Sequence, residues 1–244
     1  MSLAAIIPLK NELGNVEDMV FGASRIKLLD EIVFIDGNSE DGTYEGLVKF
    51  IANHKDKRML AIKQNLPLGK FEAIKQASRH LSSENILIWD GDNTIDYIDV
   101  RETLALYSNF QDNKSVFVVA NRLTSEKESN SFRVINLIGN YLFSLLMVPV
   151  LNKKLPDVLS GLKIFPRYLL ANNDNCDKLL DLDKFGDLTL LSLGRKYGLR
   201  FISVPCTYKA RTYGKSSIQR WSGGKNLLSV VMHLVTHRCY KNKD

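Results

Sequence analysis

Short hydrophobic runs alternate with stretches in which apolar residues recur every three or four positions along the first half of the chain. Such runs, rich in branched residues, are typical of buried strands, and the intervening spacing is typical of helices that cover a sheet. We predict strands at residues 3–8, 31–35, 59–62, 86–89 and 116–120, with helices at about 15–28, 39–51, 69–81 and 99–110. This alternation indicates an α/β fold with a mostly parallel central sheet and helices on both faces.

The hydrophobic run at 86–89 ends in Asp90-Gly91-Asp92. Because side chains two positions apart leave a strand on the same face, both carboxylates are expected to point the same way. Adjacent carboxylates repel each other unless a cation lies between them, and a hard divalent ion that keeps room for waters and phosphates suits them. A polar turn explains this stretch equally well when it is taken alone, since Asp, Gly and Asn are ordinary turn residues.

Polar residues also follow the other predicted strands, at 8–12, 36–43 and 68–70. The carboxyl ends of parallel strands meet at one edge of a sheet, and this edge is where open α/β sheets bind ligands. There Asp36 can accept hydrogen bonds from a ribose or a base, or can simply form an Asx-turn. The first strand is not followed by G-x-G-x-x-G and the chain has no Walker A loop, which weakens dinucleotide and P-loop interpretations.

Two apolar segments stand out in the second half. Residues 134–151 approach the length of a membrane span, but two Asn, a Gly and a Pro interrupt them. We interpret them as an amphipathic helix in a membrane interface, with a plain core helix as an equal alternative. Residues 218–238 have a helical pattern with basic flanks, so this helix can rest on anionic lipid, on the domain or on a second subunit.

Composition adds a compartment and a class of partner. Lys and Arg outnumber Asp and Glu by 33 to 27, and the formal net charge of +6 favours anionic partners such as a phosphorylated substrate or a membrane surface. The three cysteines, Cys176, Cys206 and Cys239, suit free thiols in a reducing compartment. The N-terminus lacks a signal-peptide layout. We expect a cytoplasmic protein, peripheral on the cytoplasmic membrane face, with no nucleic-acid partner.

Five sequence blocks resemble, in order, motifs of the family-two glycosyltransferases of the GT-A fold. Within that family they are most similar to dolichyl-phosphate mannosyltransferase and bacterial polyprenyl-phosphate sugar transferases. The blocks are 7–12 (I-P-x-x-N-E), 36–43 (D-D-G-S-x-D-G-T, with Gly37 at the second Asp), 90–92 (D-x-D), 157–165 (D-x-x-S-G-F-R-x-F) and 204–216 (V-P-x-x-Y…R…G-K-S). Each block is weak alone, and together they are specific.

The resemblance implies a Rossmann-like GT-A catalytic domain over 1–217, followed by a C-terminal amphipathic helix and basic tail over 218–244. Residues 1–120 would form the nucleotide-sugar half and 121–217 the acceptor half. Asp90 and Asp92 would hold Mg²⁺ or Mn²⁺ against the donor diphosphate. The family often has Gln where this chain has Thr94, so the metal would be held more loosely or through water. The implied donor site comprises Pro8, Asn11, Glu12, Asp36, Lys70, Asp90 and Gly91.

The resemblance also implies a polyprenyl-phosphate acceptor. The residues expected around its phosphate are basic or hydroxylic: Arg122, Arg133, Ser160, Lys163, Arg211, Lys215 and Ser216. A lipid phosphate is largely ionised at neutral pH and can attack without a strong base, whereas a hydroxyl needs a carboxylate base. Besides Asp92, the catalytic candidates are Asp157 and Asp187. We favour a site role for Asp157 and helix capping for Asp187.

Other functions stay open from sequence. A glycosyltransferase of the same class could act on a hydroxyl of a soluble or cell-envelope glycan. A nucleotidyltransferase also pairs aspartates on an α/β sheet, but it usually opens with a Gly-rich basic loop that is missing here. A sugar-nucleotide-binding regulator without turnover is the non-enzymatic alternative, and the retained Asp90 and Asp92 argue against it. The sequence does not choose between UDP and GDP donors.

Overall fold

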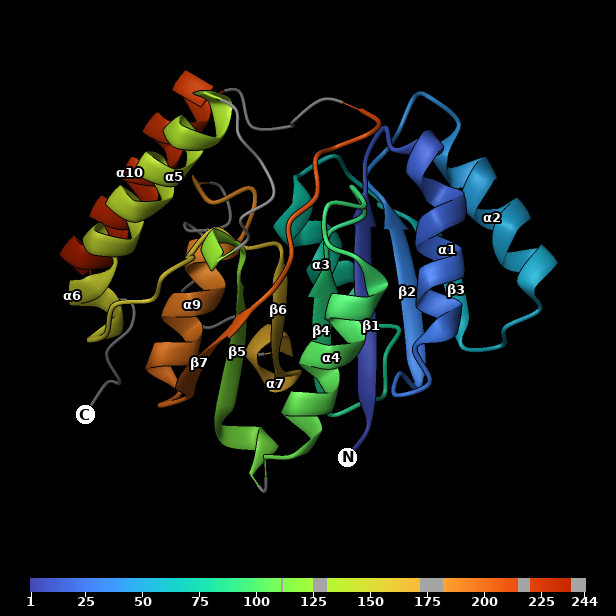
Figure 1. Cartoon of the computed structure of the whole chain (residues 1–244), viewed down its shortest axis with the longest axis horizontal. Coiled ribbons are helices and arrows are strands. Elements are labelled where there is room, and N and C mark those ends of the chain that lie inside the picture. Colours follow the sequence, from blue (N-terminus) through green and yellow to red (C-terminus); the bar gives the residue numbers. More distant parts are fainter. Residues whose placement is uncertain (111, 125–130, 172–181, 215–219, 238–244) are drawn as a thin grey trace.

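A central sheet organises the computed structural model, which describes residues 1–110, 112–124, 131–171, 182–214 and 220–237 (Figure 1). In these residues seven strands pair in the order β3-β2-β1-β4-β6-β5-β7. Every neighbouring pair is parallel except those that involve β6, which runs antiparallel to both β4 and β5. The strands are β1 Leu3–Leu9, β2 Glu31–Asp36, β3 Met59–Lys63, β4 Asn85–Trp89, β5 Val116–Asn121, β6 Leu162–Pro166 and β7 Arg200–Pro205. The predicted mostly parallel α/β sheet is confirmed.

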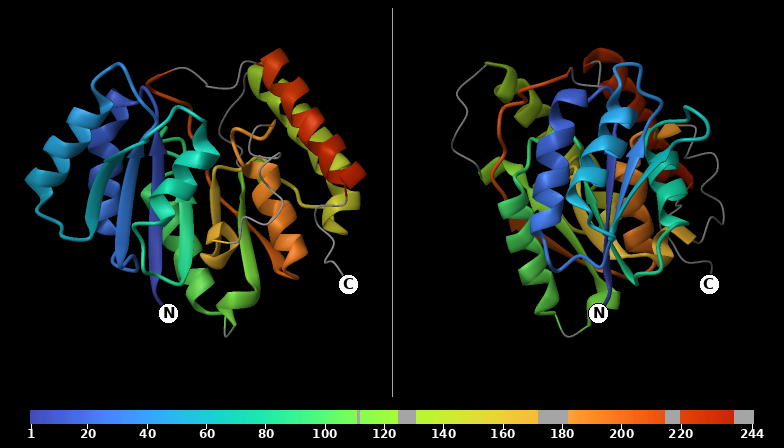
Figure 2. Two further views of the ribbon diagram at one scale, coloured as in Figure 1. Left: turned by 180° about the vertical axis from the view of Figure 1, so that it is seen from behind. Right: turned by 90° about the vertical axis from the view of Figure 1, so that its right-hand side faces the viewer.

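Helices cover both faces of this sheet and bury two separate cores (Figure 2). One core packs α1, α2 and α4 on the sheet, and the other packs α3 and α9 on the opposite face together with α5, α6, α7 and α10. Because β1 and β4 are covered on both sides, they are near-continuous hydrophobic runs. The helices are α1 Val16–Arg25, α2 Thr43–His54, α3 Lys70–Ser78, α4 Tyr97–Ser108, α5 Ser131–Leu146, α6 Val148–Leu151, α7 Tyr168–Ala171, α9 Asp187–Lys196 and α10 Arg220–His237.

The pairing of β1 with β2 and β4 sets where the ligand-binding edge lies. In register, Leu9 at the end of β1 lies beside Asp36 at the end of β2, and Ile6 lies beside Ile88 near the end of β4. Just beyond these ends, the Gly91 backbone N–H donates a hydrogen bond to the Pro8 carbonyl at 3.1 Å, which links the segment after β4 to β1. The polar segments after the parallel strands therefore meet at one edge, as expected from the sequence.

The apolar run at 134–151 does not form one helix. It is divided between α5 and α6, and α5 lies beside α10 at one end of the molecule (Figures 1 and 2). The buried side of α5 includes two polar residues beside Phe143: Asn140 and Ser144 donate hydrogen bonds to the Pro156 and Leu155 carbonyls. Its outward side carries large apolar residues, Ile138, Tyr141, Leu142 and Leu145. Among the described residues, no helix is both long and apolar enough to span a bilayer.

Candidate active site

A cavity of about 440 Å³ lies at the carboxyl edge of the sheet. Its walls come from segments that follow six strands and from the start of α9, so chain regions far apart in sequence meet there. The predicted site residues that line it are Pro8, Glu12, Lys70, Asp90, Gly91, Asp92, Arg122, Asp187 and Arg211. Sequence reasoning missed several others, including Gln64, Leu159, Phe185 and Tyr208. Tyr208 had a signal, because it is the tyrosine of the block at 204–216.

Asp90 and Asp92 open into the same cavity, but each is neutralised by a different cation. Lys70 Nζ lies 2.5 Å from Asp90 Oδ1. Burial alone would lower the pKa of Lys70, but the carboxylates of Asp90 and Asp187 outweigh it and raise this pKa. The Asp90 carboxylate packs against the backbone of Gly161, where a Cβ atom would collide with it. The block at 157–165 therefore supplies the space in which Asp90 sits.

Asp92 is held on both of its oxygens. Oδ1 accepts hydrogen bonds from the Thr94 backbone N–H at 3.2 Å and from Thr94 Oγ1 at 2.7 Å. Oδ2 lies 2.6 Å from Arg211 Nη2, while Arg211 Nη1 lies 2.5 Å from Glu12 Oε1. Burial raises the pKa of Glu12, although the charge of Arg211 works against this shift. Arg211 thus bridges Glu12 and Asp92, a contact that the sequence pattern did not predict.

The segment 206–214 after β7 carries Arg211 across the edge of the sheet towards α1 (Figure 1). It is fixed on both sides of the arginine. Before it, the Lys209 backbone N–H donates to the Thr94 carbonyl at 2.8 Å. After it, the Tyr213 ring packs directly on Gly14, which leaves no room for a side chain there. The backbone position of Arg211 is therefore well defined over the cavity.

Asp157 and Arg122 form a clamp beside the cavity. Arg122 Nε lies 2.7 Å from Asp157 Oδ2 and Nη2 lies 2.9 Å from Oδ1, and the Arg122 backbone N–H also donates to Oδ2 at 3.1 Å. Asp157 is 1% exposed and does not line the cavity, whereas Arg122 does. The geometry makes Asp157 the partner that orients Arg122 and leaves no free carboxylate oxygen facing a substrate.

Asp187 does not cap α9 in the way that we favoured from the sequence. The N-cap residue is Gly186, and the buried Asp183 carboxylate accepts the backbone N–H groups of Gly186 and Thr189, both at 2.9 Å. Asp187 points instead to Lys163, whose Nζ lies 2.5 Å from Oδ1. Burial alone would raise the pKa of Asp187, but the charges of Lys163 and Lys70 outweigh it and lower this pKa. Asp187 is therefore a cavity carboxylate that stays ionised.

The remaining predicted residues lie outside the cavity lining or outside the described part of the chain. Asn11, Asp36, Ser160 and Lys163 do not line it. Asp36 is fully buried; Oδ2 accepts from Ser39 N at 3.2 Å, and Oδ1 has no hydrogen-bond partner among the described atoms. An unpaired buried oxygen is costly, so it is a candidate for a ligand contact. The Arg133 side chain, Lys215 and Ser216 lie outside the described residues, as do Cys176 and Cys239.

The residues present suit a divalent cation only in part. Asp90 and Asp92 offer hard carboxylate oxygens in one cavity, which Mg²⁺ and Mn²⁺ prefer. In the part of the chain that the structure describes, no group of three or more His, Cys, Asp or Glu side chains is arranged as a metal site. Such a cation would need waters and substrate phosphates for its other ligands, and that is the usual way in which Mg²⁺ is held in phosphate-binding enzymes.

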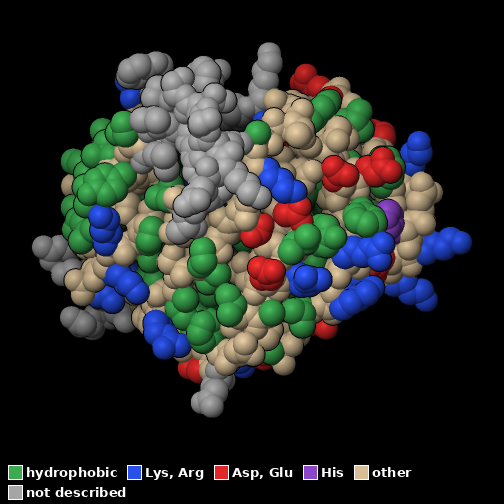
Figure 3. Space-filling view, in the orientation of Figure 1, with side chains coloured by type: hydrophobic (Ala, Val, Ile, Leu, Met, Phe, Trp, Pro, Cys, Tyr) green, Lys and Arg blue, Asp and Glu red, His purple; other side chains and the backbone are tan. Residues whose placement is uncertain are grey.

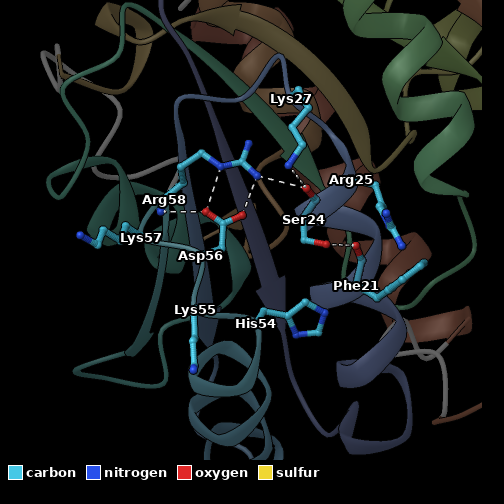
Figure 4. A pocket seen from close by; sticks show the side chains of 9 residues that line it. All are labelled: Phe21, Ser24, Arg25, Lys27, His54, Lys55, Asp56, Lys57 and Arg58. Carbon is cyan, nitrogen blue, oxygen red and sulfur yellow. Dashed lines mark hydrogen bonds and ion pairs between the residues drawn. The ribbon is translucent and has the colours of Figure 1, made fainter.

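A second cavity, also about 440 Å³, lies at the opposite edge of the sheet, where α1 and α2 end (Figure 4). Its lining is mainly basic, and basic side chains also gather on this side of the surface (Figure 3). Several of these cations have structural partners: Arg58 donates to the Ile26 and Leu29 carbonyls and pairs with Asp56 at 2.6 Å. Cations at helix C-termini are stabilised by the unpaired carbonyls there. This cavity holds no pair of carboxylates among its described lining residues and is not the candidate active site.

Comparison with known proteins gives the chain a family. The sequence model described as Glycosyl transferase family 2 matches residues 4–173. Mannosyl-3-phosphoglycerate synthase from Rubrobacter xylanophilus is similar in structure, with 19% identity and a TM-score of 0.62 over 100% of this chain and 76% of that one. Glucosyl-3-phosphoglycerate synthase from Mycobacterium tuberculosis, in complex with Mn²⁺, UDP-glucose and phosphoglyceric acid, has 17% identity and a TM-score of 0.59 over 100% and 81% of the two chains.

The mannosyltransferase PcManGT from Pyrobaculum calidifontis, in complex with GDP-Man and Mn²⁺, has 17% identity and a TM-score of 0.58 over 88% of this chain and 58% of that one. At such low identities these likenesses establish the fold. No match was found among curated protein sequences.

Proposed function

The chain belongs to glycosyl transferase family 2, and on that premise we propose that it moves a sugar from a nucleotide-sugar donor to the phosphate of a polyprenyl-phosphate acceptor. One observation carries the choice of acceptor. Each of the four carboxylates that line the described cavity, Glu12, Asp90, Asp92 and Asp187, is paired with a Lys or Arg side chain. A site of this kind suits a nucleophile that arrives already ionised.

The donor is proposed to occupy the side of the cavity formed by β1, β2 and β4. Ile35 and Gly37, on either side of Asp36 at the end of β2, support this placement because they line the cavity there. Lys70 can pair with a diphosphate oxygen next to Asp90. When a divalent cation is bound, it neutralises the departing nucleoside diphosphate, and Asp90 and Asp92 are the residues proposed to hold it. Structural neighbours contain UDP-glucose or GDP-Man with Mn²⁺, so either base is a reasonable probe.

The groups that could remove a proton from an acceptor distinguish a hydroxyl from a phosphate. A hydroxyl is a poor nucleophile and needs a base within hydrogen-bond reach. Asp157 is clamped by Arg122 behind the cavity wall, and Asp187 is held by Lys163 with a lowered pKa, which makes it a weak base. A phosphate monoester has a second pKa of about 6 and needs no base at neutral pH. The two carboxylates that the sequence offered as bases, Asp157 and Asp187, are thus poorly suited to remove a proton, and this favours phosphate as the nucleophile.

A lipid is favoured over a soluble phosphate by the surface of α5 and α10. Large apolar side chains are half exposed there, including Leu142 on α5 and Met232 on α10, and hydrophobic side chains gather over these helices in Figure 3. Residues 131–156 and 208–243 contain Lys and Arg but no Asp or Glu. An apolar face on segments that carry basic and no acidic residues is complementary to an anionic bilayer surface. We propose that this face rests on the membrane that contains the acceptor.

Transfer to a hydroxyl is the second candidate function. Its support is that Asp187 lines the cavity, and that neighbours are named as synthases of glucosyl- or mannosyl-3-phosphoglycerate, one of them in complex with phosphoglyceric acid. The two candidates differ in their need for Asp187. Loss of a general base typically costs about 10² to 10⁴ in rate, whereas an ionised phosphate does not use one.

The test is transfer of labelled sugar from UDP-glucose or GDP-mannose, with Mn²⁺, to polyprenyl phosphate in vesicles, to 3-phosphoglycerate and to a soluble glycan. We expect product with polyprenyl phosphate, and we expect Asp187→Asn/Lys163→Met to keep its rate within about tenfold of wild type. The double variant removes both charges of the buried pair, so no unpaired charge is left behind. Product with only 3-phosphoglycerate or a glycan, lost in the double variant, would replace this proposal with the hydroxyl acceptor.

A further inference from the structure

Arg211 neutralises two carboxylates of the cavity from a segment that belongs to neither of their strands. Its two terminal nitrogens lie 2.5 Å from Glu12 Oε1 and 2.6 Å from Asp92 Oδ2. The other oxygen of Asp92 accepts from Thr94, and the other oxygen of Glu12 accepts from Asn15 Nδ2 at 2.6 Å. Each carboxylate oxygen of this pair therefore already has a donor.

This arrangement has a consequence for any cation that binds Asp92. A guanidinium on a carboxylate weakens the binding of a divalent ion to that carboxylate, because the two positive charges repel each other in a partly buried site. The two hydrogen-bond donors of Asp92 differ in how easily they can move away from it. Thr94 lies only two positions after Asp92 in the same loop, whereas Arg211 reaches it through a long side chain that is 25% exposed. Arg211 can therefore move to solvent or to another anion while the backbone of 206–214 stays in place.

We propose that Arg211 is an internal counter-ion that competes with the divalent cation for Asp92 and keeps the cation affinity of the free protein low. This inference rests on the proposed function, because it assigns the cation to Asp92. A nucleoside diphosphate lifts the competition, since its phosphates give the cation further ligands and give the displaced guanidinium a new anionic partner. Arg211 is thus a positioning residue that couples binding of the cation to binding of the donor.

The experiment measures Mn²⁺ affinity without nucleotide, from the loss of the free-ion electron paramagnetic resonance signal on titration with protein. Removing the positive charge next to Asp92 should strengthen Mn²⁺ binding, so Arg211→Gln is expected to bind it at least about ten times more tightly than wild type. Lys209→Gln is the matched control. It removes one charge from the same segment, but its partner Asp96 does not line the cavity, and its affinity should stay within about twofold of wild type.

Two further variants make the outcome decisive. Arg211→Gln/Asp92→Asn should lose the gain, because the competed carboxylate is gone. Arg211→Lys keeps a charge but cannot bridge Glu12 and Asp92 with one ammonium group, so it should show a smaller gain even if the Gln variant folds poorly by circular dichroism. Equal affinity in wild type, Arg211→Gln and Arg211→Lys, or an equal gain in Lys209→Gln, would overturn the inference.

Nucleotide-sugar titrations of wild type with saturating Mn²⁺ separate this inference from the proposed function. If wild type binds neither UDP-glucose nor GDP-mannose, the proposed function fails, and the counter-ion role fails with it. If wild type binds the donor but Arg211→Gln has no advantage for Mn²⁺, only the counter-ion role is rejected.

Discussion

Arg122 holds both oxygens of Asp157 and donates its own backbone N–H to the same carboxylate. The pair joins the end of β5 to the segment before β6, two strands that run antiparallel beside each other. Asp157 is buried while Arg122 reaches the cavity, so the charge on the carboxylate serves to aim the guanidinium. A residue that looks catalytic in the sequence block 157–165 thus acts through its neighbour.

Breaking this clamp should destabilise the protein strongly. Arg122→Met leaves the Asp157 charge buried without a partner, and we expect the free energy of unfolding to fall by about 3 to 5 kcal/mol. Arg122→Met/Asp157→Leu removes both charges and should recover most of that loss. Urea denaturation followed by circular dichroism measures both variants. A loss below about 1 kcal/mol in the single variant would mean that the clamp is not a buried ion pair in solution.

Gly161→Ala should impair catalysis more than folding. The added methyl group would collide with the Asp90 carboxylate, which must rotate away from its place beside Lys70. A shift of about 1 Å in a catalytic group can cost about 10² in rate, so we expect sugar transfer to fall by about 10 to 100-fold. Gly139→Ala is the control, because a Cβ there meets nothing within 4 Å. Full transfer activity in Gly161→Ala would show that the position of Asp90 is unimportant.

The Asp56–Arg58 pair should make the free energy of unfolding depend on pH. Hydrogen bonds from Arg58 hold the pKa of Asp56 below its ordinary value, despite the opposing effect of burial. A lowered folded-state pKa stabilises the fold fully above the ordinary pKa, and this contribution disappears as pH falls through the folded-state value. Asp56→Asn should therefore lower the free energy of unfolding by about 1 to 2 kcal/mol at pH 7, and by progressively less below about pH 4. A deficit that does not change with pH would contradict the assignment.

The apolar face of α5 and α10 predicts membrane binding. Ile138 and Leu142 are 63% and 52% exposed on one side of α5. Moving a large aliphatic side chain out of water contributes about 1.5 to 3 kcal/mol, so Leu142→Glu should weaken binding to anionic vesicles about tenfold or more. Val48→Glu, on the exposed side of α2, is the matched control and should bind like wild type. Vesicle flotation measures both, and equal binding of the two variants would exclude this face.

Most of the fold could be predicted from sequence because its parallel strands are buried on both faces. Their continuous apolar runs and the turn residues after them are local signals. Strand β6 has no such signal, since Lys163 interrupts its short apolar run. That lysine is buried because Asp187 pairs with it from α9, 24 positions later. A local pattern cannot show this partner, so neither β6 nor the burial of Lys163 was predicted.

The candidate site also has features that local sequence signals predict and features that they do not. That the strand exits meet follows from topology, which is why Glu12, Lys70, Asp90 and Asp92 could be placed together from the sequence. The pairing of Arg211 with Asp92 spans 119 positions and depends on the path of the segment after β7, which no local rule fixes. The prediction that Asp187 caps α9 was wrong for a more local reason. Asp183 and Asp187 are equally good capping candidates by residue type, and only the backbone path shows that Asp183 reaches the free N–H groups.

The most direct test of the account is whether the cavity binds a nucleotide sugar through Asp92. Thermal unfolding of wild type is measured with Mn²⁺ and either UDP-glucose or GDP-mannose, and compared with Asp92→Asn. Ligand at about 100 times its Kd adds about 2.7 kcal/mol of stability, which for a chain of this size raises Tm by about 5 to 10 °C. We predict this rise for wild type with one of the two donors, and a much smaller one for Asp92→Asn. No rise with either donor in wild type, or an equal rise in Asp92→Asn, would contradict the account.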